Sequence, residues 1–381
     1  MRKTKTSGKS VLAQILLGLG LLGLLAFFIH NTAQNLAARG IASGFAFLSR
    51  PAGFDISFSL LPFGPDSTFL DAFWVGVSNT LLLSVLSMIF ASLLGLFLAL
   101  GRLASNPLVR ILSTVYVETL RNIPLLLQLF FWYFVVLREL PAARSSWEIF
   151  GSYINNRGLF VPFPKDTAIA WYLFLALLFG LVLGHLLRVM GSRLRQERGG
   201  YPRWWPLAFM LPLLCPLVLG VLLGPRAELS RPQLEGFNFA GGLQIVPELV
   251  AMIFALSLYT AAFIGEIIRA GLQSVARGQR EAAAALGLSA SDSLFLVVLP
   301  QAMRVIIPPL ISQYLNLCKN SSLAAAIAFP DLVLIFAGTA LNTSGQAVEI
   351  MAMTMLVYLL ISVILAGVLN LYQQRLLRFE R

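Results

Sequence analysis

Residues 280–300 read REAAAALGLSASDSLFLVVLP, and this stretch decides how the whole chain is interpreted. It begins with Glu281 and a run of alanines, residues that strongly favour helix. Gly287 follows, where a left-handed turn carries no steric cost, and a second apolar run then ends at Pro300. Apolar segments long enough to cross a membrane lie on both sides. The sequence therefore predicts a helix–glycine–helix unit that connects two membrane spans.

The composition places the chain in a membrane. It is 58% hydrophobic and only 12% charged over 381 residues, whereas soluble domains carry about 25% charged residues. The formal net charge of +11 is not gathered in a basic stripe or an RNA-binding motif. We therefore expect a bilayer around the chain and no nucleic acid as a partner.

The fold class that we expect is an all-α, polytopic membrane protein. A helix needs about 20 apolar residues to cross the hydrocarbon core. Eight candidate spans meet this condition, at 11–30, 75–100, 109–137, 168–188, 204–223, 249–268, 305–329 and 348–371. The apolar run 331–341 is too short to span, so we predict an interfacial or re-entrant helix there.

The distribution of Lys and Arg predicts the orientation. With eight spans and a cytoplasmic N-terminus, 18 Lys and Arg residues fall in cytoplasmic segments and 8 in outside loops. Cytoplasmic loops are normally the richer in positive charge. We therefore expect both termini and the 280–300 loop in the cytoplasm.

The chain shows no sign of being an enzyme. Its two cysteines, Cys215 and Cys318, and its two histidines fit no metal-ligand spacing. The SGKS at residues 7–10 lacks the first glycine of a phosphate-binding loop. We expect no metal, no cofactor and no catalytic residue.

Three stretches carry a family resemblance. Glu281-Ala282-Ala283, Gly287 and Pro300 match the EAA-x3-G pattern followed by Leu-Pro, and this loop follows SLYTAAFIGEIIRAGLQSVARGQ (257–279). The other two are VETLRNIPLLLQLFFWYF (117–134) and NLCKNSSLAAAIAFPDL (316–332). All three resemble the polar amino-acid permeases of ABC importers, the histidine and glutamine type. The chain looks like a permease subunit of a general L-amino-acid ABC importer in the bacterial inner membrane.

The resemblance implies an architecture and partners. It implies a five-span type I permease core with an extra N-terminal span and an inserted pair of spans. We accordingly expect five segments: a tail and extra span (1–30), a periplasmic loop (31–70), the N-terminal half of the core (75–137), the insert (138–248) and the C-terminal half of the core (249–375). The implied partners are a second permease subunit in a heterodimer, a dimer of ATP-binding subunits that hydrolyse the ATP, and a periplasmic amino-acid-binding protein. The 280–300 loop would dock on the ATPase through Glu281, Ala282, Ala283, Gly287 and Pro300.

Charged side chains inside the spans are the second group of candidates, because each costs about 2.5–3.5 kcal/mol near the bilayer centre. Lys319 is surrounded by a polar belt of Asn316, Asn320, Ser321 and Ser322. Two interpretations of Lys319 stay open: it meets the substrate on the translocation path, or it forms an ion pair at a subunit interface.

Two further pairs share the i, i+3 spacing that brings side chains together on a helix. We expect Glu118 and Arg121 to form a structural pair, and Glu266 and Arg269 to support the 280–300 loop. Prolines 124, 308 and 309 predict helix breaks. A proton-coupled secondary transporter that uses Glu118 or Glu266 is the alternative function, but such a carrier has no need of a docking loop.

Overall fold

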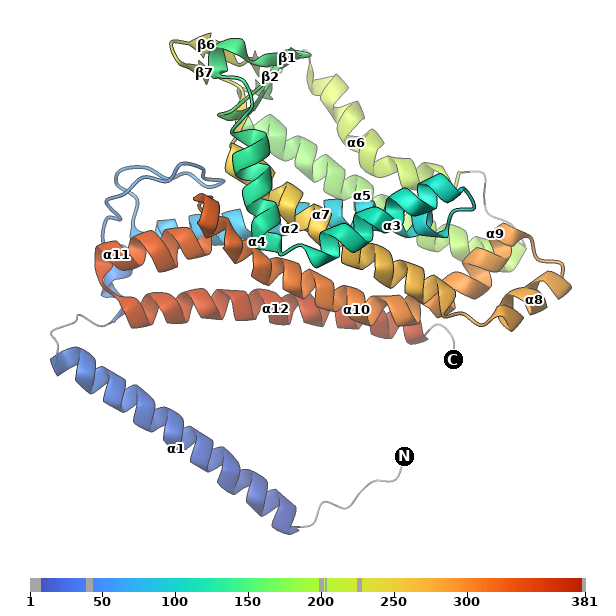
Figure 1. The fold of residues 1–381 in the computed structure, drawn as a ribbon, viewed down its shortest axis with the longest axis horizontal. Helices are drawn as coiled ribbons and strands as arrows, with labels where there is room; N and C mark the ends of the chain where they lie inside the picture. Colours follow the sequence, from blue (N-terminus) through green and yellow to red (C-terminus); the bar gives the residue numbers. More distant parts are fainter. Residues whose placement is uncertain (1–7, 39–43, 199–201, 203, 225–227, 379–381) are drawn as a thin grey trace. The chain divides into compact units, whose positions relative to one another are not determined.

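The computed structural model describes residues 8–38, 44–198, 202, 204–224 and 228–378. Sections of the predicted N-terminal tail, the first outside loop, the insert and the C-terminus lie outside these residues. The chain forms two compact units (Figure 1). Unit 2 runs from Tyr133 to Val250, and unit 1 comprises the chain on either side of it.

Unit 1 is built from helices. Its N-terminal portion contains α1 (Gly8–Ala38), the short 3-10 helix η1 (Phe45–Ser49), α2 (Phe69–Leu103), α3 (Pro107–Asn122) and α4 (Leu125–Phe130). Helix α4 continues into η2 (Phe131–Leu137), which belongs to unit 2 from Tyr133 onward. Its C-terminal portion contains α7 (Pro247–Gln273), α8 (Arg277–Ala285), α9 (Ala290–Asp292), η5 (Ser293–Val298), α10 (Leu299–Asn320) and η6 (Ser321–Ile327). It ends with η7 (Val333–Ala340), α11 (Leu341–Ser344) and α12 (Ala347–Arg378), which packs along α10 (Figure 1).

Five helical segments of the described chain are long and apolar enough to cross a membrane: 69–103, 171–191, 247–273, 290–327 and 347–371. A sixth would be the bent pair 107–122 and 125–137 if it crosses as one span. The apolar stretches of the predicted first and fifth spans, 12–28 and 207–223, are shorter. The structure therefore supports a polytopic helical protein, but not the full count of eight spans.

The helices differ in how deeply they are buried within the chain. In the most apolar 18-residue stretch of α7, 56% is buried inside the structure. In the corresponding stretch of α12, only 6% is buried. Ala91 and Ala261, from α2 and α7, are fully buried and small, which allows close helix packing in a membrane. We infer that α7 is a core helix and that α12 presents its apolar side chains to lipid.

The prolines behave in two different ways. At Pro124 the helix breaks and the chain bends by 107°, so the predicted span 109–137 is not straight. The side-chain amide of Gln128 donates to the carbonyl oxygens of Leu120 and Ile123, at 2.9 Å each, and so satisfies groups that the end of α3 leaves free. Pro308 and Pro309 lie inside α10, which continues through them. The predicted break at these two residues is wrong, because packing of the surrounding turns holds the helix despite the lost amide donors.

Unit 2 contains a helical hairpin. Helix α5 (Thr167–Arg198) packs against α6 (Leu207–Leu223). A side chain at Gly180 or Gly184 would collide with the backbone of α6, because a Cβ there would lie 2.5 Å from the carbonyl oxygen of Leu211 or 2.4 Å from that of Ala208. The Gly-x3-Gly spacing therefore lets the two backbones approach closely.

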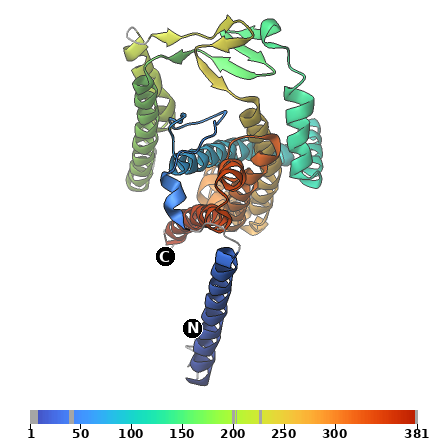
Figure 2. The same ribbon diagram turned by 90° about the vertical axis from the view of Figure 1, so that its left-hand side faces the viewer.

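Unit 2 also contains strands, so the all-α prediction is wrong for the insert. The strands are β1 (Trp147–Ile149), β2 (Ser152–Asn155), β3 (Gly158–Val161), β4 (Phe163–Pro164), β5 (Leu229–Ser230), β6 (Gln233–Glu235), β7 (Asn238–Ala240) and β8 (Leu243–Ile245). They form one four-stranded sheet in the order β1-β2-β3-β8 and two strand pairs, β4-β5 and β6-β7. Because β4 leads into α5, the sheets gather at one end of the hairpin (Figure 2). Segments before α5 and after α6 pair across the hairpin, which no local pattern could reveal.

The predicted helix at 331–341 is present as η7 and α11. Asp331 is fully buried at its start, and its carboxylate accepts a hydrogen bond from the amide of Leu334 at 2.8 Å. Thr80 of α2 accepts one from the amide of Leu332 at 3.0 Å. Side chains from two regions of the chain thus fix the entry to this short helix; its depth in the membrane stays a prediction.

Candidate functional site

Helix α8 is the central element of the opening stretch. It begins at Arg277, so Glu281 lies in its second turn and does not start the helix. Ala283 is only 2% exposed, while Glu281, Ala282 and Ala284 are exposed. Helix α8 therefore packs on η5 through the face that carries Ala283. Its opposite face is exposed.

The end of α8 is closed by a Schellman motif at Gly287. Its φ is +75°, the amide of Leu288 donates to the carbonyl of Ala283 at 3.1 Å, and the amide of Gly287 donates to that of Ala284 at 2.9 Å. A Cβ at Gly287 would meet nothing within 4 Å. The glycine is needed for its backbone conformation and not for space inside this chain. The turn leaves Leu286 82% exposed at the tip of the loop.

The second half of the loop is one continuous helical run. The hydroxyl of Ser289 accepts from the amide of Asp292 at 3.1 Å and caps the run. The run covers 290–327, and Pro300 lies in the first turn of α10. The helix therefore does not end at Pro300, where the second apolar run of the loop ends: it continues through the proline, directly after the π-helix η5.

Two side chains tie α8 to its neighbours. The guanidinium of Arg280 donates to the carbonyl oxygen of Leu272 at 3.0 Å, at the end of α7. The amide of Gln301 on α10 donates to the side-chain oxygen of Gln279 at 3.3 Å. Glu281 has no hydrogen bond or ion pair with another described residue. The loop is thus anchored on one face and carries an exposed carboxylate and an exposed leucine on the other.

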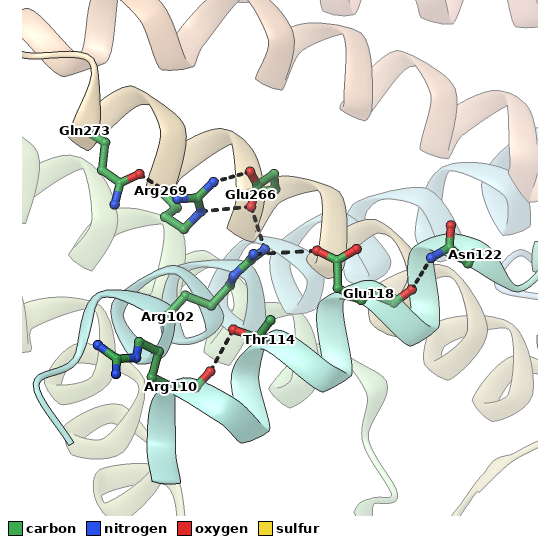
Figure 3. A network of polar contacts seen from close by, with 8 residues as sticks. All are labelled: Arg102, Arg110, Thr114, Glu118, Asn122, Glu266, Arg269 and Gln273. Atoms are coloured by element: carbon green, nitrogen blue, oxygen red, sulfur yellow. Dashed lines mark hydrogen bonds and ion pairs between the residues drawn. The ribbon is translucent and has the colours of Figure 1, made fainter. Parts of the chain in front are cut away.

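An ion network lies at the end of α7 that leads to α8 (Figure 3). Glu266 binds Arg269 at 2.5 and 2.9 Å, which confirms the predicted pair, and also Arg102 of α2 at 2.5 Å. Arg269 in turn donates to Gln273 at 2.5 Å. The Arg102 side chain is only 12% exposed, so its charge depends on this carboxylate. We call the group Arg102, Glu118, Glu266 and Arg269 the Arg102 network.

Glu118 and Arg121 do not pair with each other. Glu118 lies 3.6 Å from Arg102, and Arg121 stacks over the ring of Phe263 at 5.1 Å from its centroid. The i, i+3 spacing is correct, but residues from α2 and α7 supply the partners. Arg102 is the member of this site that the sequence analysis missed, because only the fold brings it to Glu266.

A polar cavity of about 240 Å³ lies between α7 and α10. Its lining includes Asn316 and Asn320 of the predicted belt. It also includes residues that the sequence analysis missed: Tyr259, Thr260 and Phe263 of α7, and Gln313 and Leu317 of α10. The spacing of Gln313, Asn316 and Asn320 places them on one helical face, a signal that could have identified Gln313.

The rest of the predicted belt lies elsewhere. Ser321 is buried and its hydroxyl donates to the carbonyl of Cys318 at 2.7 Å, while that of Ser322 donates to the carbonyl of Lys319 at 2.8 Å. These two serines satisfy backbone groups and do not line the cavity. Lys319 is exposed and does not belong to the lining either. The five belt residues therefore separate into a cavity pair, two backbone-bonded serines and one outward lysine.

Comparison with known proteins gives consistent matches. Residues 202–378 match the family model described as "Binding-protein-dependent transport system inner membrane component". The chain is 49% identical to YhdX of Escherichia coli K12, over 97% of this chain and 94% of that protein. It is 44% identical to the general L-amino acid transport system permease protein AapQ of Rhizobium johnstonii, over 98% and 93%. It is 38% identical to the glutamate/glutamine/aspartate/asparagine transport system permease protein BztB of Rhodobacter capsulatus, over 99% and 95%.

Proposed function

The chain belongs to the family of amino-acid ABC transporter permeases, and we propose that it contributes to the path by which L-amino acids cross the bacterial inner membrane into the cell. The observation that carries the proposal is the exposed α8 loop between two membrane-spanning helices. A carrier driven by protons is not favoured, because relatives that match almost the entire chain are permeases of this family.

The α8 loop is the docking site for a separate ATP-hydrolysing subunit, which we propose is present as a dimer. Leu286 at the tip and the exposed face with Glu281 and Ala282 form its contact surface. The positive-inside bias of the sequence supports a cytoplasmic location for the loop and for both chain termini. The remaining partners are a second permease subunit and a periplasmic amino-acid-binding protein.

The Arg102 network gives the docking site a route to the spans. Arg280 connects α8 to the end of α7, so a displacement of α8 would displace that end as well. Near this end of α7, Glu266 forms ion pairs with Arg269 and with Arg102 of α2. Closure of the ATPase dimer would thus move α7 and α2 together. Transporters move whole helices around the substrate site, so that the site opens first to one side of the membrane and then to the other.

Substitutions at Gly287 test the turn that presents Leu286. We expect Gly287→Val to weaken ATPase binding, because a β-branched residue disfavours φ near +75°. The left-handed conformation costs an ordinary residue about 1–2 kcal/mol, which would displace the tip without unfolding the spans. Gly287→Asn is the matched control, since Asn tolerates this conformation. Equal co-purification of the ATPase with both variants would contradict this role of the glycine.

The cavity between α7 and α10 is the proposed substrate site. Its polar groups are amides and hydroxyls, so it can hydrogen-bond both ends of an amino-acid zwitterion without selecting one side-chain charge. Of the five belt residues this site keeps Asn316 and Asn320, and its other polar groups are those of Tyr259, Thr260 and Gln313.

Gln313→Leu tests this site with nearly constant side-chain volume. Loss of one hydrogen bond to a charged group is worth about 1.5–3 kcal/mol, so we expect the KM for uptake to rise by about tenfold or more. Ser312→Ala, one position away on an exposed side of α10 outside the cavity, should leave the KM unchanged. The measurement is uptake of labelled amino acid by vesicles at several concentrations; identical KM values for the two variants would rule out this cavity.

ATP hydrolysis by the reconstituted complex tests the proposed function. The chain, purified with its second permease subunit and ATPase in lipid vesicles, should hydrolyse ATP faster when the binding protein carries an amino acid. The chain alone should hydrolyse none. Failure of any ATPase subunit to co-purify with the chain would contradict the proposal.

A further inference from the structure

Between residues 305 and 319, α10 exposes a face that carries polar as well as apolar side chains. Val305, Ser312, Asn316 and Lys319 are exposed and follow one another at steps of seven, four and three residues. Such steps place side chains on one side of a helix. Pro308 and Pro309 lie exposed within the same stretch. We call Val305, Ser312, Asn316 and Lys319 the α10 stripe.

Lys319 has no acidic partner among the residues that the structure describes. No described Asp or Glu lies within ion-pair distance of its ammonium group, and its side chain has no hydrogen bond to a described residue; only its backbone carbonyl is used, by Ser322. Lys319 lies inside the run 290–327, which is long and apolar enough to cross a membrane. A charge that faces lipid within such a run carries a large cost, so we infer that something other than lipid covers it.

The polar cavity does not account for Lys319. Asn316 lines the cavity and also belongs to the α10 stripe, whereas Lys319 is exposed and is not one of the lining residues. The two surfaces therefore adjoin at Asn316. A structure that covers the stripe would lie beside the cavity and could complete its wall.

We propose that the α10 stripe is the contact face for the second permease subunit, and that Lys319 forms an ion pair with a carboxylate of that subunit inside the membrane. This rests on the proposed function, which requires two permease subunits. Charge complementarity selects a protein surface with an acidic residue, because the ammonium group donates three hydrogen bonds that lipid tails cannot accept. The small side chain of Ser312 allows a second helix to approach closely.

A cross-linking experiment tests the contact face. A photoactivatable maleimide is attached to Ser312→Cys in a chain whose Cys215 and Cys318 are replaced by Ala, and the complete complex is irradiated in lipid vesicles. We expect a covalent adduct with the second permease subunit. Val363→Cys, whose native side chain is 60% exposed on α12, is the control and should give lipid adducts only. Lipid adducts alone at residue 312 would overturn the proposal.

Charge substitutions test the ion pair. Lys319→Glu should reduce the recovery of the second permease subunit with the tagged chain by tenfold or more, while Lys319→Arg should keep it near the native level. Changing the partner carboxylate to Lys should restore assembly of Lys319→Glu. An intact complex in Lys319→Glu with only a raised KM for uptake would overturn the proposal in favour of contact with the substrate.

The native complex separates failure of this inference from failure of the proposed function. If the native chain purifies with a second permease subunit and hydrolyses ATP in response to the binding protein, the function holds whatever the variants show. If no second permease subunit purifies with the native chain, the result contradicts the proposed function itself, and with it this inference.

Discussion

Leu286→Asp should abolish recovery of the ATPase subunit with this chain, while the spans remain inserted and folded. Leu286 is 82% exposed at the tip of the loop, and an apolar side chain held there by a closed turn is suited to fill a pocket of a partner. Full burial of a leucine side chain stabilises a contact by about 1.5–3 kcal/mol, and burial of a charge in its place is unfavourable. The measurement is the amount of ATPase that co-purifies with the tagged chain.

Phe237→Asp is the control for the loss of an exposed apolar side chain. Phe237 is 72% exposed in the turn between β6 and β7 of unit 2, outside the α8 loop. This variant should retain the ATPase in full. Equal retention in both variants would show that Leu286 is not an anchor.

Glu266→Gln should have the second large effect, on the coupling of ATP hydrolysis to transport. The substitution leaves Arg269 without its carboxylate, and Arg102 with only Glu118 at 3.6 Å. Loss of hydrogen bonds to charged groups costs about 1.5–3 kcal/mol, and the 25% exposure of Glu266 keeps the value below that of a fully buried pair. We expect a lower unfolding temperature and fewer amino acids transported for each ATP hydrolysed.

Glu118→Gln is the matched control within the same network. Glu118 is 55% exposed, and exposed ion pairs contribute about 0–1 kcal/mol. Its effect on stability should be small. If Glu266→Gln lowered stability but left the ratio of uptake to hydrolysis unchanged, the network would be structural and would not transmit the movement of α8.

Local chemistry in the sequence was sufficient to predict the α8 loop. Alanines favour helix, Gly287 permits the left-handed turn, and Ser289 caps the next helix; each needs only a few neighbouring residues. The positions of the long apolar helices follow from hydropathy in the same way. The turn at Pro124 and the pair of Glu266 with Arg269 are also local features.

Features that depend on distant segments could not be predicted. Arg102 reaches Glu266 across 164 positions of sequence, so the partner of Glu118 could not be read from its own helix. The strands of unit 2 are short, and β3 pairs with β8 across the α5–α6 hairpin. Pro308 and Pro309 carry the same local signal as Pro124, but neighbouring helices decide that α10 continues. The cavity likewise needs two helices to be placed side by side before Tyr259 and Gln313 can meet.

The most direct test of the account is uptake of a labelled L-amino acid into vesicles that contain the complete complex, with the binding protein supplied at the outer face. ATP inside the vesicles should drive accumulation, and a proton gradient without ATP should drive none. Accumulation driven by a proton gradient, in vesicles that contain this chain alone, would contradict the assignment of the α8 loop as the point where ATP hydrolysis moves the membrane spans.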